Sequence, residues 1–403
     1  MSITEKEKDF IIIGGGIVGL VLAYKIKIKF PQKTVLVIEK EKNSVSHGTG
    51  RNSGVIHSGI YYSPETLKAK YCVSGSKQLK EYVQSRNLWI DQCGKILLPT
   101  SKRSLQSLHL LMERAKSNGV EAHVLSGDQL CAMEPNCNPV YDIGIHVPFT
   151  SVVDPKEVAN SILDDVIKLG GDVLYSSEVT KVDATNGYVQ TPFMRYRGEV
   201  IINSAGLHAD KIAGLSGFSS HYSFLPFKGK YWRFASKYKM QKLVYPIPNL
   251  DLPFLGVHTV HNKKGHVYVG PSSTPVFGRE NYAGWSGLEI KEFMSLTFSF
   301  FKKILFNVNG LRDLAFRELG LLLPGGIYRE SRSLVKNTNG VKLSIASEKV
   351  GIRSQIFDDQ NKHLVSDFVI KRQGRIVHIL NAISPAFTAS FGLADMIIDE
   401  YLD

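Results

Sequence analysis

The feature that most constrains the fold is a glycine motif close to the N-terminus. Residues 10–19 read FIIIGGGIVG, so a short apolar run leads into Gly14, Gly16 and Gly19 with the spacing G-x-G-x-x-G. In a βαβ unit the first glycine permits a tight turn, the second lets a pyrophosphate approach the backbone, and the third lets helix and strand pack closely. The N-terminus of the following helix then points at the phosphates.

Glu39 completes this pattern. It stands twenty residues after Gly19, at the end of a second apolar run over 34–38, and Pro31 marks the end of the helix between them. A carboxylate at this place accepts hydrogen bonds from a ribose. A glycine motif alone is weak evidence, and an ordinary glycine-rich turn is its alternative. Such a turn has no need of the acid, so the full order of elements predicts a dinucleotide-binding unit.

Bulk properties limit the class of protein. A chain of 403 residues is too long for one compact core and predicts two or three domains. The first nine residues have neither the apolar core of a secretion signal nor an arginine-rich import pattern, so we expect a cytoplasmic protein. The four cysteines form no C-x-x-C pair and no zinc-spaced cluster with histidine, which predicts free thiols and no metal; they are Cys72, Cys93, Cys131 and Cys137.

The net charge of +12 raises the question of an acidic partner. The lysines are scattered and not interleaved with aromatic residues, so we expect no nucleic acid; a generally lysine-rich surface is favoured, and an anionic membrane surface is the next alternative. Residues 291–323 bear on this choice, because apolar residues recur there at helical spacing. Charged residues interrupt the run, so it cannot span a bilayer. We expect amphipathic helices that either lie on a membrane surface or are buried against a second domain.

The rest of the chain predicts alternating elements. A polar loop over 40–59 is long enough to be functional. Helices are expected over 67–84 and 104–117, after Asp128 as a cap, from Asp154-Pro155 and from 388 to the end; strands are expected over 96–99, 173–176, 188–191, 199–203 and 376–380. Ser204-Ala205-Gly206 ends one of these strands in small residues. This predicts a second cofactor contact, with a plain strand-to-helix turn as the alternative.

Residues 224–277 have a different character. They are rich in strand formers, and the clearest strands are expected over 231–234, 254–258 and 266–269. This composition predicts a mainly antiparallel sheet in a second domain that caps the ring of the cofactor.

Two features favour FAD over a nicotinamide cofactor. Residues 50–62 read GRNSGVIHSGIYY. The small residues of this stretch suit a backbone that passes beside a flat ring system. The C-terminus also returns as a strand, a turn and a helix, so both ends of the chain can enclose one long cofactor.

Several segments carry a family resemblance that runs nearly from end to end. Residues 50–62, 67–69, 253–258, 269–271, 351–355 and 378–388 resemble the L-2-hydroxyglutarate dehydrogenase/oxidase family, within the D-amino-acid-oxidase-like (DAO) group of FAD oxidoreductases. The chain departs from the family pattern at Ser354, Ile383 and Phe387, and it matches poorly over 325–347. The resemblance implies oxidation of L-2-hydroxyglutarate to 2-oxoglutarate by hydride transfer from C2 to flavin N5, with electrons passed to oxygen or a membrane quinone.

Three tasks follow for the protein. A base must take the hydroxyl proton, and His57 is the first candidate, with His258 as its rival and a structural or cofactor-tethering role as the alternative for His57. The C1 carboxylate requires a bidentate partner, and Arg353 matches a Gly-x-Arg motif of the wider group. Candidates for the distal carboxylate are Tyr62, Tyr245 and Arg279, together with Arg51, Lys68 and Lys228. The expected cofactor-binding residues are Gly14, Gly16, Gly19, Glu39, Lys40, Arg51, Asn52, Ser53, Gly54, Val179, Ala205, Gly206, Ser384, Ala386 and Thr388.

These observations predict an α/β protein in which a Rossmann-like FAD-binding domain interleaves with an α+β substrate domain. The first domain is expected to comprise 1–90, 145–215 and 345–403, and the second 91–144 and 216–344. An amine or amino-acid oxidase of the same fold, and a non-catalytic flavin-binding protein recruited to membranes, are the alternatives. If 291–323 lies on a membrane, the expected location becomes the cytoplasmic face of the inner membrane.

Overall fold

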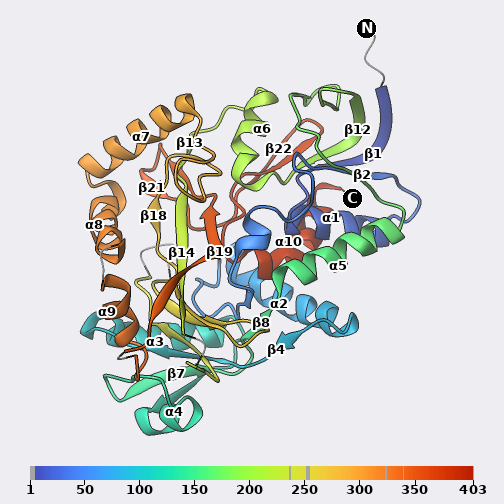
Figure 1. Cartoon of the computed structure of the whole chain (residues 1–403). Coiled ribbons are helices and arrows are strands. Elements are labelled where there is room, and N and C mark those ends of the chain that lie inside the picture. Colours follow the sequence, from blue (N-terminus) through green and yellow to red (C-terminus); the bar gives the residue numbers. More distant parts are fainter. Residues whose placement is uncertain (1–4, 236, 251–254, 323–324, 339, 403) are drawn as a thin grey trace.

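The computed structural model of the chain describes residues 5–235, 237–250, 255–322, 325–338 and 340–402. Its largest sheet has eight strands (Figure 1). Strands β9, β2, β1, β12 and β23 lie parallel in this order, whereas β10, β11 and β22 run antiparallel to their neighbours. The strands are β1 (Glu5–Ile13), β2 (Val35–Ile38), β9 (Asp172–Leu174), β10 (Lys181–Asp183), β11 (Tyr188–Gln190), β12 (Arg195–Asn203), β22 (Ile370–Gln373) and β23 (Ile376–Ile379).

The predicted βαβ unit is present at the centre of this sheet. Helix α1 (Ile17–Lys29) begins directly after the glycine turn and ends before Pro31. Gly14 has a φ of +109°, and a Cβ there would lie 2.7 Å from the carbonyl oxygen of Ser204. A Cβ on Gly19 would lie 2.1 Å from the carbonyl oxygen of Gly14. Only glycine therefore fits these two positions, because one requires a left-handed backbone and both require close packing.

Alternation along the strands builds two apolar layers, one on each face of the sheet. Ile12 and Val37 belong to a core shared with helices α1, α2 (Leu67–Ser85), α5 (Pro155–Lys168) and α10 (Ala386–Tyr401). Ile11 and Ile38 belong to a separate core on the other face, with α6 (Ala209–Leu215). Asp154 caps α5, and Pro155 is its first residue, as predicted.

A second group of sheets stands beside this layer (Figure 1). One is antiparallel throughout, with β14 (Phe227–Phe234) paired to β17 (Val267–Gly270), β18 (Thr274–Pro275) and β19 (Leu343–Arg353), and β16 (His258–His261) at its edge. Another has the order β15 (Leu243–Pro246), β5 (Lys95–Leu98), β7 (Ile143–Val147) and β6 (His123–Ser126). The mainly antiparallel sheet expected from residues 224–277 is thereby confirmed.

Short elements complete the described part of the chain. Two three-stranded sheets are formed by β13 (Tyr222–Phe224), β20 (Ile356–Asp358) and β21 (His363–Leu364), and by β3 (Val55–Ile56), β8 (Ser151–Val153) and β4 (Ile90–Asp91). The other helices are α3 (Lys102–Ser117), α4 (Gly127–Met133), α7 (Ile290–Leu305), α8 (Leu311–Leu322) and α9 (Gly326–Arg332). None of the described helices combines the length and the hydropathy needed to cross a bilayer.

Two local predictions were wrong. Ser126, not Asp128, caps α4, because its hydroxyl accepts from the backbone of Gln129 and Gln129 returns a bond in a capping box. The strand expected over 254–258 begins only at His258, where pairing with Gly270 of β17 starts; residue 254 lies outside the described residues. The division into domains stays a prediction: 1–90, 145–215 and 345–403 hold every strand of the eight-stranded sheet, while β4, β7 and β19 cross the expected boundaries.

Candidate active site

A cavity of about 850 Å³ opens where the glycine turn, the loop after β2, the C-terminal turn and the capping strands meet. Gly14, Gly16 and Glu39 line it, and so do His57, His258 and Arg353. Residues 384–388 line it as well, so both ends of the chain contribute to one cavity. The structure thus brings together the residues predicted for the dinucleotide and those predicted for the chemistry.

The dinucleotide part of the cavity combines bare backbone at the glycine turn with a carboxylate held in place. Glu39 accepts hydrogen bonds from the amides of Gly15 at 2.8 Å and Glu41 at 2.9 Å, which fix its carboxylate at the wall. A Cβ on Gly16 would lie 3.3 Å from Thr49 Oγ1, so a side chain there would narrow the approach to the start of α1. A helix N-terminus, a bare turn and a held carboxylate fit the pyrophosphate and ribose of FAD.

The loop expected beside the flavin ring is tied to the C-terminal helix. The His57 amide donates to Thr388 Oγ1 at 3.1 Å, and this hydroxyl donates to the carbonyl of Val55 at 3.3 Å. A Cβ on Gly351 would lie 3.1 Å from the carbonyl oxygen of Arg51, so β19 passes close to the same loop. Three segments that are distant in sequence thereby hold one another in place.

Two buried histidines, His57 and His258, line the part of the cavity where we expect the chemistry, which we call its reactive end. Burial lowers the pKa of His57 to about 3, and its Nδ1 has no hydrogen-bond partner among the described residues. Burial also lowers the pKa of His258 to about 3. His258 Nδ1 lies 2.9 Å from the carbonyl oxygen of Gly256, which assigns the proton to Nδ1 and leaves Nε2 as the basic atom, 3.3 Å from Tyr231 Oη. Both rings are therefore neutral at pH 7 and able to accept a proton.

Arg353 is the last residue of β19, where it pairs with Phe227 of β14. Its guanidinium lines the cavity and donates from Nη1 to Ser273 Oγ at 2.7 Å. Burial lowers the pKa of Arg353, yet an arginine keeps its charge in a protein. A fixed, buried fork of donors at a cavity wall suits a carboxylate.

Most predicted cofactor residues line the cavity. Gly19 and Gly54 do not, and both act through the backbone instead: a Cβ on Gly54 would lie 2.3 Å from the carbonyl oxygen of Val153. The remaining predicted residues that line it are Lys40, Arg51, Asn52, Ser53, Val179, Ala205, Gly206, Ser384, Ala386 and Thr388.

Of the six residues predicted for the distal carboxylate, Arg51 lines the cavity, whereas Lys68 and Lys228 do not, and Lys228 Nζ donates to Asn281 Oδ1 at 2.8 Å. Tyr62, Tyr245 and Arg279 do not line it either. Arg279 points away from it, since Nη2 bonds Asp210 at 2.8 Å and Nε bonds Glu292, a bridge between α6 and α7. Tyr245 lies behind the wall, with its ring stacked on His258 at 3.9 Å, and Tyr62 lies against Lys68. The structure does not bring these residues to the cavity, and their direct contact with substrate stays a prediction.

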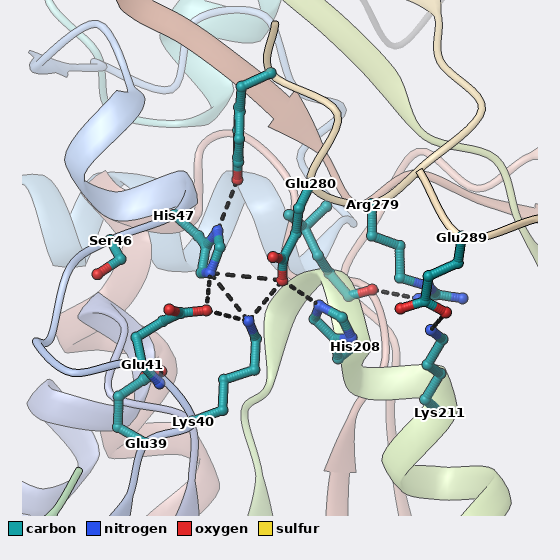
Figure 2. A network of polar contacts seen from close by, with 12 residues as sticks. Glu39, Lys40, Glu41, Ser46, His47, His208, Lys211, Arg279, Glu280 and Glu289 are labelled. Carbon is teal, nitrogen blue, oxygen red and sulfur yellow. Dashed lines mark hydrogen bonds and ion pairs between the residues drawn. The ribbon is translucent and has the colours of Figure 1, made fainter. Parts of the chain in front are cut away.

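A charged cluster at the cavity rim was not predicted (Figure 2). Glu280, from the loop before α7, meets Lys40 Nζ at 2.6 Å and His208 Nε2 at 2.9 Å, while His47 bonds Glu41 at 2.9 Å. Bonds from His208 and Lys40 hold the pKa of Glu280 well below its usual range. The partners are too far apart in sequence for any local pattern to reveal them.

Two groups in the described part of the chain have donor sets that could hold a metal ion. One is Glu41, His47 and Glu280, but the Lys40 ammonium already supplies the positive charge between these carboxylates. The other is Asp91, Cys93 and His261, of which Asp91 and His261 already bond each other at 2.8 Å.

Comparison with known proteins agrees with this geometry. The sequence matches the DAO family, described as FAD dependent oxidoreductase, over residues 9–400. L-2-hydroxyglutarate dehydrogenase of Indibacter alkaliphilus is 34% identical, and the match covers 96% of this chain and 97% of that protein. The mitochondrial L-2-hydroxyglutarate dehydrogenase of Bos taurus is 32% identical, and the match covers 97% of this chain and 88% of that protein. The expected family and its FAD cofactor are thereby confirmed.

Solved structures show the same fold. L-alpha-glycerophosphate oxidase from Mycoplasma pneumoniae, with FAD bound, superposes with a TM-score of 0.74 at 20% identity, covering 98% of this chain and 94% of its own. Glycine oxidase from Geobacillus kaustophilus gives 0.70 at 14% identity, with the same coverage. The chain belongs to the DAO family of FAD-dependent oxidoreductases.

Proposed function

We propose that this enzyme oxidises L-2-hydroxyglutarate to 2-oxoglutarate. The observation that carries the proposal is the wall of the cavity where a buried arginine, Arg353, faces the same space as two neutral histidines, His57 and His258. An arginine can bind a carboxylate, and a neutral histidine beside it can accept a hydroxyl proton. The names of the relatives that are about one-third identical over nearly the whole chain support the same substrate.

The residues divide the work as follows. FAD, when bound, supplies the two-electron acceptor for the C2 hydrogen. Arg353 binds the C1 carboxylate through two parallel hydrogen bonds and so fixes the orientation of C2. His57 accepts the hydroxyl proton as the C2–H bond breaks with both its electrons, which leaves the keto group of the product. His258 keeps Tyr231 in place at the wall through the contact at Nε2.

Anaerobic mixing tests this proposal. L-2-Hydroxyglutarate should bleach the oxidised-flavin band at about 450 nm, and the D-enantiomer should leave it unchanged. His57→Asn should slow the bleaching more strongly than His258→Asn if His57 is the base. Glycine and D-amino acids serve as the panel for an amine oxidase. A flavin that L-2-hydroxyglutarate fails to reduce would refute the proposed substrate.

We also propose that α7 and α8 rest on an anionic membrane and that electrons pass to a quinone there. Large apolar side chains on these helices are exposed, with 71% of Phe298, 63% of Phe301 and 67% of Phe316 accessible. Exposed Lys302 and Arg312 lie on the same two helices. Apolar side chains flanked by cations are typical of helices that lie in the headgroup region. In this proposal the enzyme is peripheral on the cytoplasmic face of the inner membrane.

Vesicle sedimentation tests the membrane proposal. The enzyme should pellet with vesicles rich in phosphatidylglycerol and remain in the supernatant with phosphatidylcholine alone. Phe298→Ser with Phe301→Ser should abolish pelleting, while Phe193→Ser, which changes a side chain 78% exposed between β11 and β12, should not. Equal pelleting of all three proteins would contradict the docking surface. Reoxidation by a short-chain quinone and by oxygen can then be compared directly.

A further inference from the structure

A group of buried polar atoms without partners lies directly behind the histidines. Among the described residues, the side chains of Lys95, Tyr61, Tyr245 and Ser58 each have a buried polar atom with no hydrogen bond, as does Nδ1 of His57. Such atoms are rare in folded proteins, and each one requires an explanation. Lys95 acts on the rings of Tyr61, Tyr245 and His57, so four of these five groups are neighbours, and their grouping points to a function for this region.

Lys95 is the most unusual member of the group. It starts β5, between β15 and β7, and none of its surface is accessible. Its Nζ lies 4.4 Å from the ring centre of Tyr61 and 5.3 Å from that of Tyr245, and the described residues offer it no ion pair. Ring faces offset only part of the cost of burying an ammonium group. The fold therefore buries an amine whose charged form has no counter-ion among the described residues.

The groups that face Lys95 do not supply a negative charge. They are Cys72, His57, His258 and the two tyrosines. Burial raises the pKa of Cys72 to about 12 and raises those of Tyr61 and Tyr245 well above their usual value, so these groups stay neutral at pH 7. Burial lowers the pKa of Lys95 to about 7, and a nearby anion would restore its full charge.

Lys95 is also close to the cavity. Tyr245, whose ring faces its ammonium, stacks on His258 with centroids 3.9 Å apart and planes 9° apart, and His258 is part of the cavity wall. Lys68 adds a second buried cation on the same side, with Nζ 5.7 Å from the ring of Tyr62 and 4% of the residue exposed. Two buried amines thus act on His57, and of the two only Lys68 has a carboxylate, that of Asp367, among the groups that shift its pKa.

We propose that Lys95 is a specificity-determining residue, whose buried charge behind the histidine pair selects substrates that carry a second carboxylate. This inference rests on the proposed function. A 2-hydroxy acid with one carboxylate satisfies Arg353 and leaves Lys95 without a counter-ion. A diacid satisfies both, because Coulomb attraction acts through the intervening rings in a region that excludes water.

The experiment compares two substrates of equal chain length. L-2-Hydroxyglutarate has a distal carboxylate where L-2-hydroxypentanoate has a methyl group. The ratio of their kcat/KM values, from flavin reduction, should fall at least tenfold in Lys95→Met, mainly through a higher KM for the diacid. Lys95→Gln keeps a polar donor without the charge and should lose the ratio equally.

The matched control is another buried lysine. Lys27 is 6% exposed, and its ammonium is satisfied by the carbonyls of Pro31 at 2.8 Å and Lys33 at 2.9 Å. Lys27→Met should leave the substrate ratio unchanged even if it lowers stability.

A ratio that stays within twofold of wild type in either Lys95 variant would overturn the inference, and so would an equal loss of activity on both substrates. Failure of the wild-type enzyme to oxidise L-2-hydroxyglutarate would instead refute the proposed function, and the inference with it.

Discussion

Replacing Gly19 with alanine should weaken FAD binding, because α1 has no room for a methyl group at this position. The added Cβ would lie 2.1 Å from the carbonyl oxygen of Gly14 and 2.7 Å from Ser204 Oγ. Both atoms belong to turns that line the cavity, so the helix or the turns must move by about 1 Å to relieve the overlap. That movement displaces the backbone that approaches the pyrophosphate.

The magnitude follows from two opposing terms. Overpacking of a tight contact costs roughly 1–3 kcal/mol, while alanine gains up to about 1 kcal/mol over glycine within a helix. The net loss of free energy is about 1–2 kcal/mol. This corresponds to roughly tenfold weaker FAD binding if the displacement acts mainly on the backbone that approaches the pyrophosphate. Gly320→Ala in α8 is the matched control, since no atom lies within 4 Å of its added Cβ. It should stabilise the protein by up to about 1 kcal/mol.

The assay is the flavin-to-protein ratio after dialysis, combined with thermal unfolding with and without added FAD. Gly19→Ala should lose flavin and melt lower, and Gly320→Ala should keep its flavin and melt slightly higher. A Gly19→Ala protein with full flavin content and a raised melting temperature would refute the argument, because it would mean that close contact between α1 and the turn is not needed.

Three further outcomes are expected. Arg353→Met should lower kcat/KM for the hydroxy acid by at least about 100-fold in stopped-flow flavin reduction, with flavin content unchanged. Glu280→Gln should release FAD faster at pH 7, measured by flavin fluorescence, because it removes the carboxylate that joins Lys40 and His208. The pKa of Glu280 is lowered, so this stabilisation is present above the ordinary pKa and is lost only as pH falls through the lowered value. Thr388→Val should reduce kcat several-fold at constant flavin content, since the amide of His57 loses its acceptor.

The parts of the site that depend on residues close together in the chain could be predicted from the sequence. The glycine turn, α1, β2 and Glu39 occupy one stretch, and each position has a steric or hydrogen-bonding requirement that few residue types meet. The same holds for Asp154 at the start of α5, whose carboxylate accepts from the amides of the first helical turn. Local rules of this kind apply whatever the rest of the chain does.

The parts of the site that depend on contacts between distant segments could not be predicted from the sequence. Lys95 begins a short strand and would ordinarily be read as a surface residue; only the pairing of β5 with β15 and β7 buries it. Glu280 lies in a loop without periodicity, and its partners come from the loop after β2 and the turn after β12. Arg279 was expected to bind substrate, but its guanidinium is bonded to Asp210 of α6 and Glu292 of α7 instead.

The distribution of charge along the cavity gives the site a direction. At the dinucleotide end the Glu39 carboxylate is held by backbone amides, and the cationic side chains of Lys40 and Arg51 line the same part of the cavity. The reactive end has Arg353 in the wall and Lys95 behind it. A dianionic substrate is therefore attracted toward the histidines, which favours binding with its carboxylates near these two cationic side chains. Burial keeps both imidazoles neutral, and the nearby cations lower their pKa further. A bound diacid offsets those cations, which makes the imidazole that accepts the hydroxyl proton more basic.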